Sequence, residues 1–226
     1  MIEILYDCPL FTVAVKPAGF LSEEGEGSFP ALLKQELSLP RLYPVHRLDR
    51  VVSGVMVYAK TPQVAAELSK ERALTKTYLT VVKGVGLPPE GELSDLLFKD
   101  SKKNKTFVVS AKRKGVREAS LFYRVLEENL DKPLSLVFVT LQTGRSHQIR
   151  AQFSHRKHPV LGDGKYGGSD NAVKNIALFS HGLQFSVQGK EYRFFAFPKS
   201  EYPWNLFPLQ ELVKCFTDKI PFSPKK

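Results

Sequence analysis

Short apolar runs recur along the chain, and most have the alternating or continuous apolar pattern of β-strands. They cover residues 2–6, 11–15, 55–59, 78–82, 107–110, 120–126, 134–141 and 192–197. Two of them, VMVYA (55–59) and LSLVFVTL (134–141), are apolar on both faces, a pattern typical of strands covered on both sides. The hydrophobic pattern therefore predicts a strand-rich protein.

Three segments have a helical pattern instead. They are FPALLKQEL (29–37), TPQVAAELSKERA (61–73) and GRSHQIRAQFSHR (144–156). The second is the clearest, because Thr61 suits the N-cap and Pro62 the first helical position. An apolar stripe follows at Val64, Ala65 and Leu68.

Strands and helices do not alternate regularly, and no internal repeat or long low-complexity linker divides the chain. This order favours an α+β fold over a doubly wound one, with a mixed, mostly antiparallel central β-sheet flanked by helices and loops. A chain of 226 residues suits one large domain or two small ones. We expect a single domain over residues 1–226.

Composition indicates a folded, cytoplasmic protein. Hydrophobic residues make up 42% of the chain, enough for a buried core. No apolar run approaches the ~20 residues that span a bilayer. The N-terminus, MIEILYDCPLFTVAVKP, lacks the basic segment of a signal peptide. The two cysteines, Cys8 and Cys215, suit a reducing compartment.

The chain is strongly basic, with a formal net charge of +10. Lys and Arg that neutralise phosphates release counterions, so this charge favours a polyanionic partner. Two basic segments, KDSKKNK (99–105) and KRKGVR (112–117), bracket the strand-like TFVVS. We expect one phosphate-binding patch, although a solvated charged hairpin has the same pattern. Its candidate residues are Lys102, Lys103, Lys105, Lys112, Arg113 and Lys114.

The chain contains partial matches to familiar cofactor and hydrolase motifs, but none has the surrounding sequence that the motif requires. GDGKYG (162–167) has the glycines of a dinucleotide-binding loop but lies among turns. No Walker A sequence occurs, and Val51 breaks the nucleophile elbow that Ser53 would need. Three histidines lack a metal-binding spacing and are interpreted as surface or phosphate-facing: His147, His155 and His158.

One carboxylate stands among basic side chains directly before the run at 55–59. In VHRLDR (45–50), Asp49 is surrounded by His46, Arg47 and Arg50. Taken alone, this arrangement favours a structural role for Asp49, as an N-terminal cap or in a surface salt bridge with Arg47 or Arg50.

Two further segments change that interpretation. LQTGRSHQIRAQ (141–152) places Arg145 and Arg150 around a predicted helix N-terminus, which suits a phosphate. KTYLTVVKG (76–84) places Tyr78 at the start of a predicted strand. A carboxylate, several arginines and an aromatic ring are the groups that hold a nucleotide out of its stack.

Taken in order, these motifs resemble those of the RluA-type family of RNA pseudouridine synthases. VAVKPAGFLS resembles the opening N-K-P-x-G, HRLDRVVSG resembles H-R-L-D-R-x-T-S-G, and KTYLTVVKG resembles K-x-Y-x-A-x-V-x-G. TGRSHQIRAQF, HPVLGDGKYG and ALFSHGLQF resemble the remaining motifs, so the resemblance covers nearly the whole chain. Val15, Val52 and Phe179 depart from the usual Asn, Thr and His, which implies altered loop geometry or substrate choice.

The resemblance implies conversion of uridine to pseudouridine in rRNA or tRNA, with an active-site cleft across the middle of the sheet. Asp49 would be the nucleophile or general base, and attack on the base, attack on C1′ and proton removal at C2′ all stay open. Arg145 would pair with Asp49, Arg47 would replace the flipped nucleotide, and Tyr78 would pack on the base. His46 and Arg150 are further substrate-binding candidates.

This reaction needs no cofactor and no metal. The first motif begins about ten residues into the chain, so we expect no separate N-terminal RNA-binding domain and direct contact between RNA and the basic segments. We expect a monomer without membrane association. Two alternatives remain: an inactive RNA-binding protein of the same fold, and a hydrolase of nucleotides or phosphoesters, for which the chain shows neither a triad nor a metal cluster.

Overall fold

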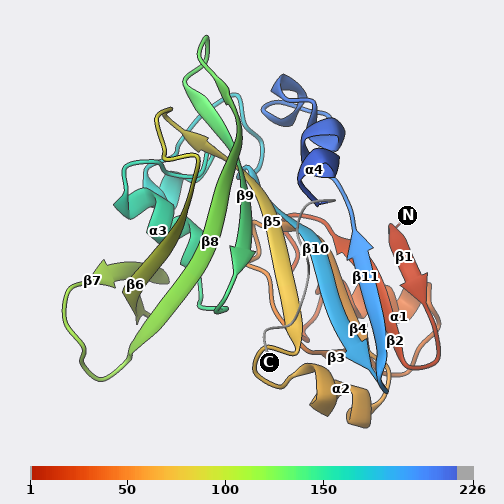
Figure 1. Cartoon of the computed structure of the whole chain (residues 1–226). Coiled ribbons are helices and arrows are strands. Elements are labelled where there is room, and N and C mark those ends of the chain that lie inside the picture. The colour runs from red at the N-terminus through yellow and green to blue at the C-terminus, as the bar shows by residue number, and fades with distance from the viewer. Residues whose placement is uncertain (1, 218–226) are drawn as a thin grey trace.

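The computed structural model describes residues 2–217, and a single large sheet forms its centre (Figure 1). The strands are β1 (Ile4–Asp7), β2 (Phe11–Lys16), β3 (Tyr43–Pro44), β4 (Ser53–Ala59), β5 (Leu74–Lys83), β6 (Glu90–Asp100), β7 (Lys105–Val109), β8 (Val116–Asn129), β9 (Leu134–Leu141), β10 (Leu178–Val187) and β11 (Lys190–Phe195). The helices are α1 (Phe29–Glu36), α2 (Pro62–Leu68), α3 (Gln148–His155) and α4 (Leu209–Thr217), with short 3-10 turns η1 (Gly164–Tyr166) and η2 (Trp204–Leu206).

The sheet has the order β1-β2-β4-β10-β5-β9-β8-β6-β7, with β11 beside β10 and β3 beside β4. Its neighbouring strands are antiparallel except β4 and β10, which run parallel where Ser53 and Gly54 meet Phe179 and Ser180. A Cβ atom on Gly54 would lie 2.3 Å from the carbonyl oxygen of Ser180, so only glycine permits this approach. The expected mixed, mostly antiparallel sheet is confirmed.

Helices cover both faces of the sheet, and the alternation of side chains decides which face each residue joins. On one face, residues of β4, β5 and β9 pack with α1 and α3; they are Met56, Tyr58, Tyr78, Val139, Phe29, Leu33, Ile149 and Phe153. On the other face, α2 packs against β4 through Val64 and Val57, while Val213 of α4 packs against Leu79 and Phe138. The predicted double-sided burial is confirmed for residues 55–59 and for 134–139, whereas Thr140 and Leu141, at the end of the predicted strand, are only partly buried.

The three predicted helices exist, with different ends. Ser28 and Thr61 cap α1 and α2 by accepting hydrogen bonds from the backbone N–H groups of Ala31 and Val64, at 3.3 Å each. Helix α2 ends at Leu68 rather than continuing to residue 73. Residues 69–73 form a turn instead, in which Arg72 adopts a left-handed φ of 63°.

Several elements were not predicted: β3, β6, β10 and α4. In the described part of the chain, no helix combines the length and apolar character needed to cross a bilayer. Cys8 is a half-buried free thiol, whereas the side chain of Cys215 lies outside the described residues.

Candidate active site

The loop that carries Asp49 joins β3 to β4. Hydrogen bonds from Lys16 connect this loop to the segment that follows β2. The fully buried ammonium of Lys16 donates to the carbonyls of Pro17 (2.9 Å), Phe20 (3.0 Å) and Arg50 (3.5 Å). Burial lowers the pKa of Lys16 to about 8, although the charge of Asp49 opposes this shift. Lys16 therefore holds the residue next to Asp49 in place.

Arg150 connects Asp49 to a second carboxylate. Its Nη1 lies 2.8 Å from Oδ2 of Asp49, while its Nε and Nη2 donate to the two oxygens of Asp163 at 2.6 and 3.0 Å. The side chains of Arg150 and Asp163 are only 5% and 2% exposed, and that of Asp49 is 15% exposed. Burial alone would lower the pKa of Arg150, but both carboxylates raise it overall. A charge-assisted, bidentate pair thus fixes the guanidinium that faces Asp49.

His147 supplies a second polar group beside Asp49, and its tautomer follows from its neighbours. The hydroxyl of Tyr166 accepts from the backbone N–H of Thr106 at 2.8 Å, so it donates its own proton to Nδ1 of His147 at 2.9 Å. The Nε2–H of neutral His147 then faces Oδ2 of Asp49, 3.7 Å away. Burial lowers the pKa of His147 to about 4, against the charge of Asp49. Of the two alternatives given for His147, surface or phosphate-facing, the first is wrong, because its side chain is only 8% exposed.

A cleft of about 220 Å³ opens above Asp49. Its walls come from the Asp49 loop, strands β5, β9 and β10, and the N-terminus of α3. Tyr78 lies in the middle of β5 rather than at its start, is 6% exposed, and lines this cleft. Burial, together with the charge of Asp49, raises the pKa of Tyr78, so its hydroxyl stays protonated. A charged carboxylate beside an aromatic wall can act on a planar ring as nucleophile or base.

His46 lines the cleft as a neutral donor. Its Nε2 accepts from the backbone N–H of Val57 at 3.1 Å, which places the ring proton on Nδ1. That Nδ1 is buried and has no hydrogen-bond partner among the described residues. Burial lowers the pKa of His46 to about 3, helped by the charge of Lys76.

The structure brings Arg47, Arg145 and Arg150 to the same cleft. The expectation that Arg145 pairs with Asp49 is wrong, because Nε of Arg145 donates to the carbonyl of Glu118 at 3.0 Å and Arg150 occupies that place. Arg47 is exposed and contacts Glu23 at 3.4 Å.

The two basic segments lie at one end of β6, where Phe98 pairs with Val116 and Asp100 pairs with Lys105. Lys102, Lys103 and Lys114 are exposed. The other three are engaged: Lys112 pairs with Glu118 at 2.5 Å, Arg113 lies 4.9 Å over Phe98, and Lys105 lies 5.0 Å over Tyr166.

The first segment packs beside the Asp49 site. Lys99 donates to the hydroxyl of Ser146 at 3.0 Å, and the hydroxyl of Thr106 donates to the carbonyl of Ser146 at 2.8 Å. Because Ser146 also lines the cleft, the β6–β7 turn stands at its rim.

Sequence reasoning passed over Lys16, Asp163 and Tyr166 as functional residues. Each lies inside a quoted motif, but only the fold shows that they converge on Asp49 and Arg150. Within the described residues, no group of three or more His, Cys, Asp or Glu side chains is placed to hold a metal ion.

Comparison with known proteins identifies the family of this chain. A family model described as RNA pseudouridylate synthase matches residues 11–155. Ribosomal large subunit pseudouridine synthase D of Borreliella burgdorferi is 31% identical over 89% of this chain, which spans 65% of that relative's length. tRNA pseudouridine synthase C of Pasteurella multocida is 31% identical over 87% of this chain and 86% of the relative.

Solved structures extend the agreement to the fold. Human RNA Pseudouridylate Synthase Domain Containing 1 superimposes with a TM-score of 0.82 at 21% sequence identity, over 100% of this chain and 97% of that one. Human RNA Pseudouridylate Synthase Domain Containing 4 gives a TM-score of 0.72 at 22% identity, over 87% and 89% of the two chains. From its sequence match and its fold, this chain belongs to the RNA pseudouridylate synthase family.

Proposed function

We propose that this protein isomerises uridine to pseudouridine in structured RNA, with Asp49 as the catalytic carboxylate. The observation that carries the proposal is the placement of Asp49, held by Arg150, at the cleft that Tyr78 also lines. In the reaction the N1–C1′ bond breaks, the uracil turns, and C5 bonds to C1′; the hydrogen of C5 leaves to water as a proton, and N1 takes up a proton in its place. Nothing is oxidised, and no group is transferred between molecules.

Each residue of the site has a role that follows from its position. Asp49 attacks the nucleoside or removes a proton from it, splitting a difficult step into easier ones. Arg150 is a positioning residue, because Asp163 fixes it and it in turn fixes Asp49. Tyr78 packs on the flipped uracil, and exposed Arg47 at the rim fills the space that the nucleotide leaves.

RNA reaches this cleft across a basic rim. The β6–β7 turn, with Lys102 and Lys103, stands beside Ser146 of the cleft and suits the phosphate backbone. The names of the two relatives point to large-subunit rRNA in one case and tRNA in the other, so both RNA classes are candidate substrates. A loop or distorted stem is favoured, since unstacking costs about a few kcal/mol.

The organisation of the protein is part of the proposal. The described residues form one catalytic domain that contacts RNA and acts as a monomer in the cytoplasm. Light scattering of the purified chain, with and without bound RNA, tests the monomer; a stable dimer would contradict it.

Two measurements test the activity. Cellular RNA carrying tritium at uridine C5 should release tritium to water when incubated with the protein. Pseudouridine mapping of total RNA, with and without this gene, should reveal the modified uridine. Binding of RNA without tritium release from any RNA would instead support an inactive RNA-binding protein.

A further inference from the structure

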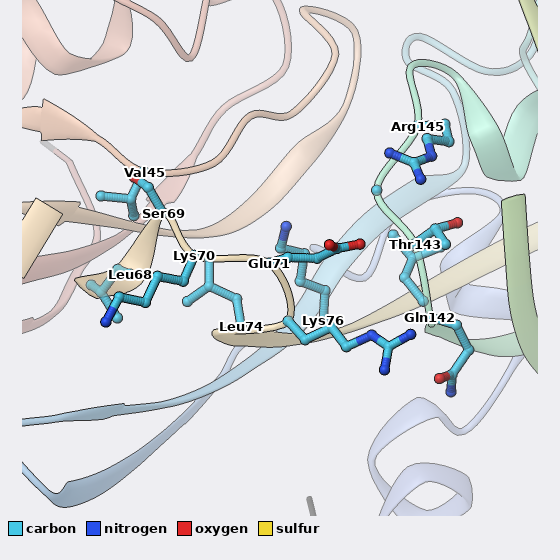
Figure 2. A pocket seen from close by; sticks show the side chains of 13 residues that line it. Val45, Leu68, Ser69, Lys70, Glu71, Leu74, Lys76, Gln142, Thr143 and Arg145 are labelled. Carbon is cyan, nitrogen blue, oxygen red and sulfur yellow. The ribbon is translucent and has the colours of Figure 1, made fainter. Parts of the chain in front are cut away.

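A second cleft of about 170 Å³ lies between residues 69–74, which lead from α2 into β5, and residues 141–145, which lead from β9 towards α3 (Figure 2). It is continuous with the cleft above Asp49, because the two share lining residues at one junction. The shared residues are Val45, Lys76, Leu141, Gly144 and Arg145.

The second cleft is basic. Its lining holds the basic side chains of Lys70, Arg72, Lys76 and Arg145, against the single carboxylate of Glu71. The turn that carries Arg72, with a left-handed φ of 63°, lies directly before the start of β5 at Leu74. A cleft with such an excess of positive charge favours an anionic ligand.

Two of these cations are available where the clefts join. Lys76 is half-buried, and no hydrogen bond or ion pair with another described residue engages its ammonium; burial lowers its pKa. Arg145 uses Nε to reach the carbonyl of Glu118, which leaves its two Nη groups without partners in the described part of the chain. Figure 2 shows both side chains reaching into the space between the two loops.

Partial burial of the Lys76 ammonium without a partner costs free energy, so its retention at the junction indicates a ligand that supplies the missing charge. Exposed Arg145 offers its two Nη groups to the same ligand. A polynucleotide running from one cleft into the other must pass Lys76 and Arg145, because both residues line both clefts. The chemical group that such a chain presents between neighbouring nucleotides is a phosphodiester.

We propose that the second cleft binds the nucleotide next to the flipped uridine, with Lys76 and Arg145 contacting the phosphodiester between the two. This inference rests on the proposed function. It adds a subsite that reads the strand beside the target, while the target uracil stays against Tyr78.

The test combines two changes: a substitution that removes one positive charge from the protein, and an RNA in which one phosphate is replaced by an uncharged group. The probe is the synthetic stem-loop carrying the mapped uridine, together with versions that have one methylphosphonate linkage within two nucleotides on either side of it. Dissociation constants and tritium release are measured for the wild type, for Lys76→Met, and for Arg72→Gln, which tests the cleft should Lys76→Met fail to fold. Lys199→Met, an exposed lysine outside both clefts, is the control with the same charge change.

One linkage next to the target should weaken wild-type binding about tenfold when neutralised, as expected for a hydrogen bond to a charged group. The same linkage should have little further effect in Lys76→Met and its full effect in Lys199→Met. If the losses of affinity from the protein substitution and from the neutralised linkage add at every linkage, while the wild type releases tritium normally, the subsite is overturned and the proposed function is not. Absence of tritium release by the wild type would overturn the proposed function, and the subsite with it.

Discussion

The guanidinium of Arg150 lies 2.8 Å from the carboxylate of Asp49, although the two residues are 101 positions apart in the chain. Asp49 lies on the loop before β4, whereas Arg150 lies on α3 beyond β9. The catalytic geometry proposed for this protein therefore depends on packing α3 against one face of the sheet. Substitutions at either residue should separate chemistry from folding.

Asp49→Asn should abolish tritium release while leaving RNA affinity nearly unchanged. Asparagine keeps the size of the side chain and part of its hydrogen bonding, but it is neither a nucleophile nor a base. The arginines around it lose a neutralising carboxylate, so attraction to phosphates should not fall. Tritium release and a binding isotherm at fixed salt check this; release at near the wild-type rate would remove Asp49 from the mechanism.

Arg150→Met should destabilise the protein by about 3–5 kcal/mol, because it leaves the carboxylate of Asp163 buried and unpaired. Arg145→Met is the matched control, since Arg145 bonds only a backbone carbonyl with its Nε and should lose about 1 kcal/mol or less. Urea unfolding of both variants measures the difference. Equal stabilities would show that the Asp49–Arg150–Asp163 chain contributes nothing to the fold.

Lys102→Ala combined with Lys103→Ala should weaken RNA binding and flatten its salt dependence. Each lost phosphate contact removes about 0.7–0.9 from the slope of log affinity against log salt. Lys105 is left intact, because its ammonium packs over the Tyr166 ring and its removal would disturb the site. The control is Lys190→Ala with Lys199→Ala, the same charge change on exposed residues. An unchanged slope in the first variant would place RNA elsewhere.

Acid should destabilise the protein partly through His181, which is 1% exposed and donates from Nδ1 to the carbonyl of Ala196 at 2.6 Å. Burial lowers the pKa of His181 to about 4, against 6.5 in an unfolded chain. Between these values only the unfolded chain binds the proton, so the free energy of unfolding should fall as the pH drops from about 6.5 to 4. The largest contribution is about 1.4 kcal/mol per pH unit.

Urea unfolding at several pH values measures this dependence. His181→Gln should reduce the slope, whereas His155→Gln, on an exposed histidine, should keep it. Parallel slopes for the two variants would contradict the assignment to His181.

The sequence predicted those parts of the fold that depend on local pattern. Residues 55–59 and 134–139 are apolar on both faces because helices cover both sides of the sheet, and that pattern was visible in the chain. Thr61 and Pro62 marked the start of α2 because N-cap and first-turn preferences are also local. The end of α2 was mispredicted, because SKERA contains good helix formers. Only the structure, with its left-handed turn at Arg72, shows that the helix ends before this segment.

The sequence named several side chains of the candidate cleft, but not which of them pair. Asp49 stood out because of the charges next to it in sequence, whereas its actual partner, Arg150, is selected by the register of α3 against the sheet. Arg145 looked equally suitable in sequence, but it points to Glu118. Strand β6 was missed because EGELSDLLFKD is mostly polar, as befits a strand near the edge of the sheet.

The parallel contact of β4 with β10 has a consequence for the order in which the protein is made. Strand β10 lies between β4 and β5, yet it leaves the ribosome more than ninety residues after β5 begins. Until then the nascent chain has two strand edges without their final neighbour, which are sites for pairing with other chains. Gly54 closes this gap by letting the backbone of Ser180 approach. Synthesis of β10 therefore supplies the missing neighbour of both strands and removes both edges.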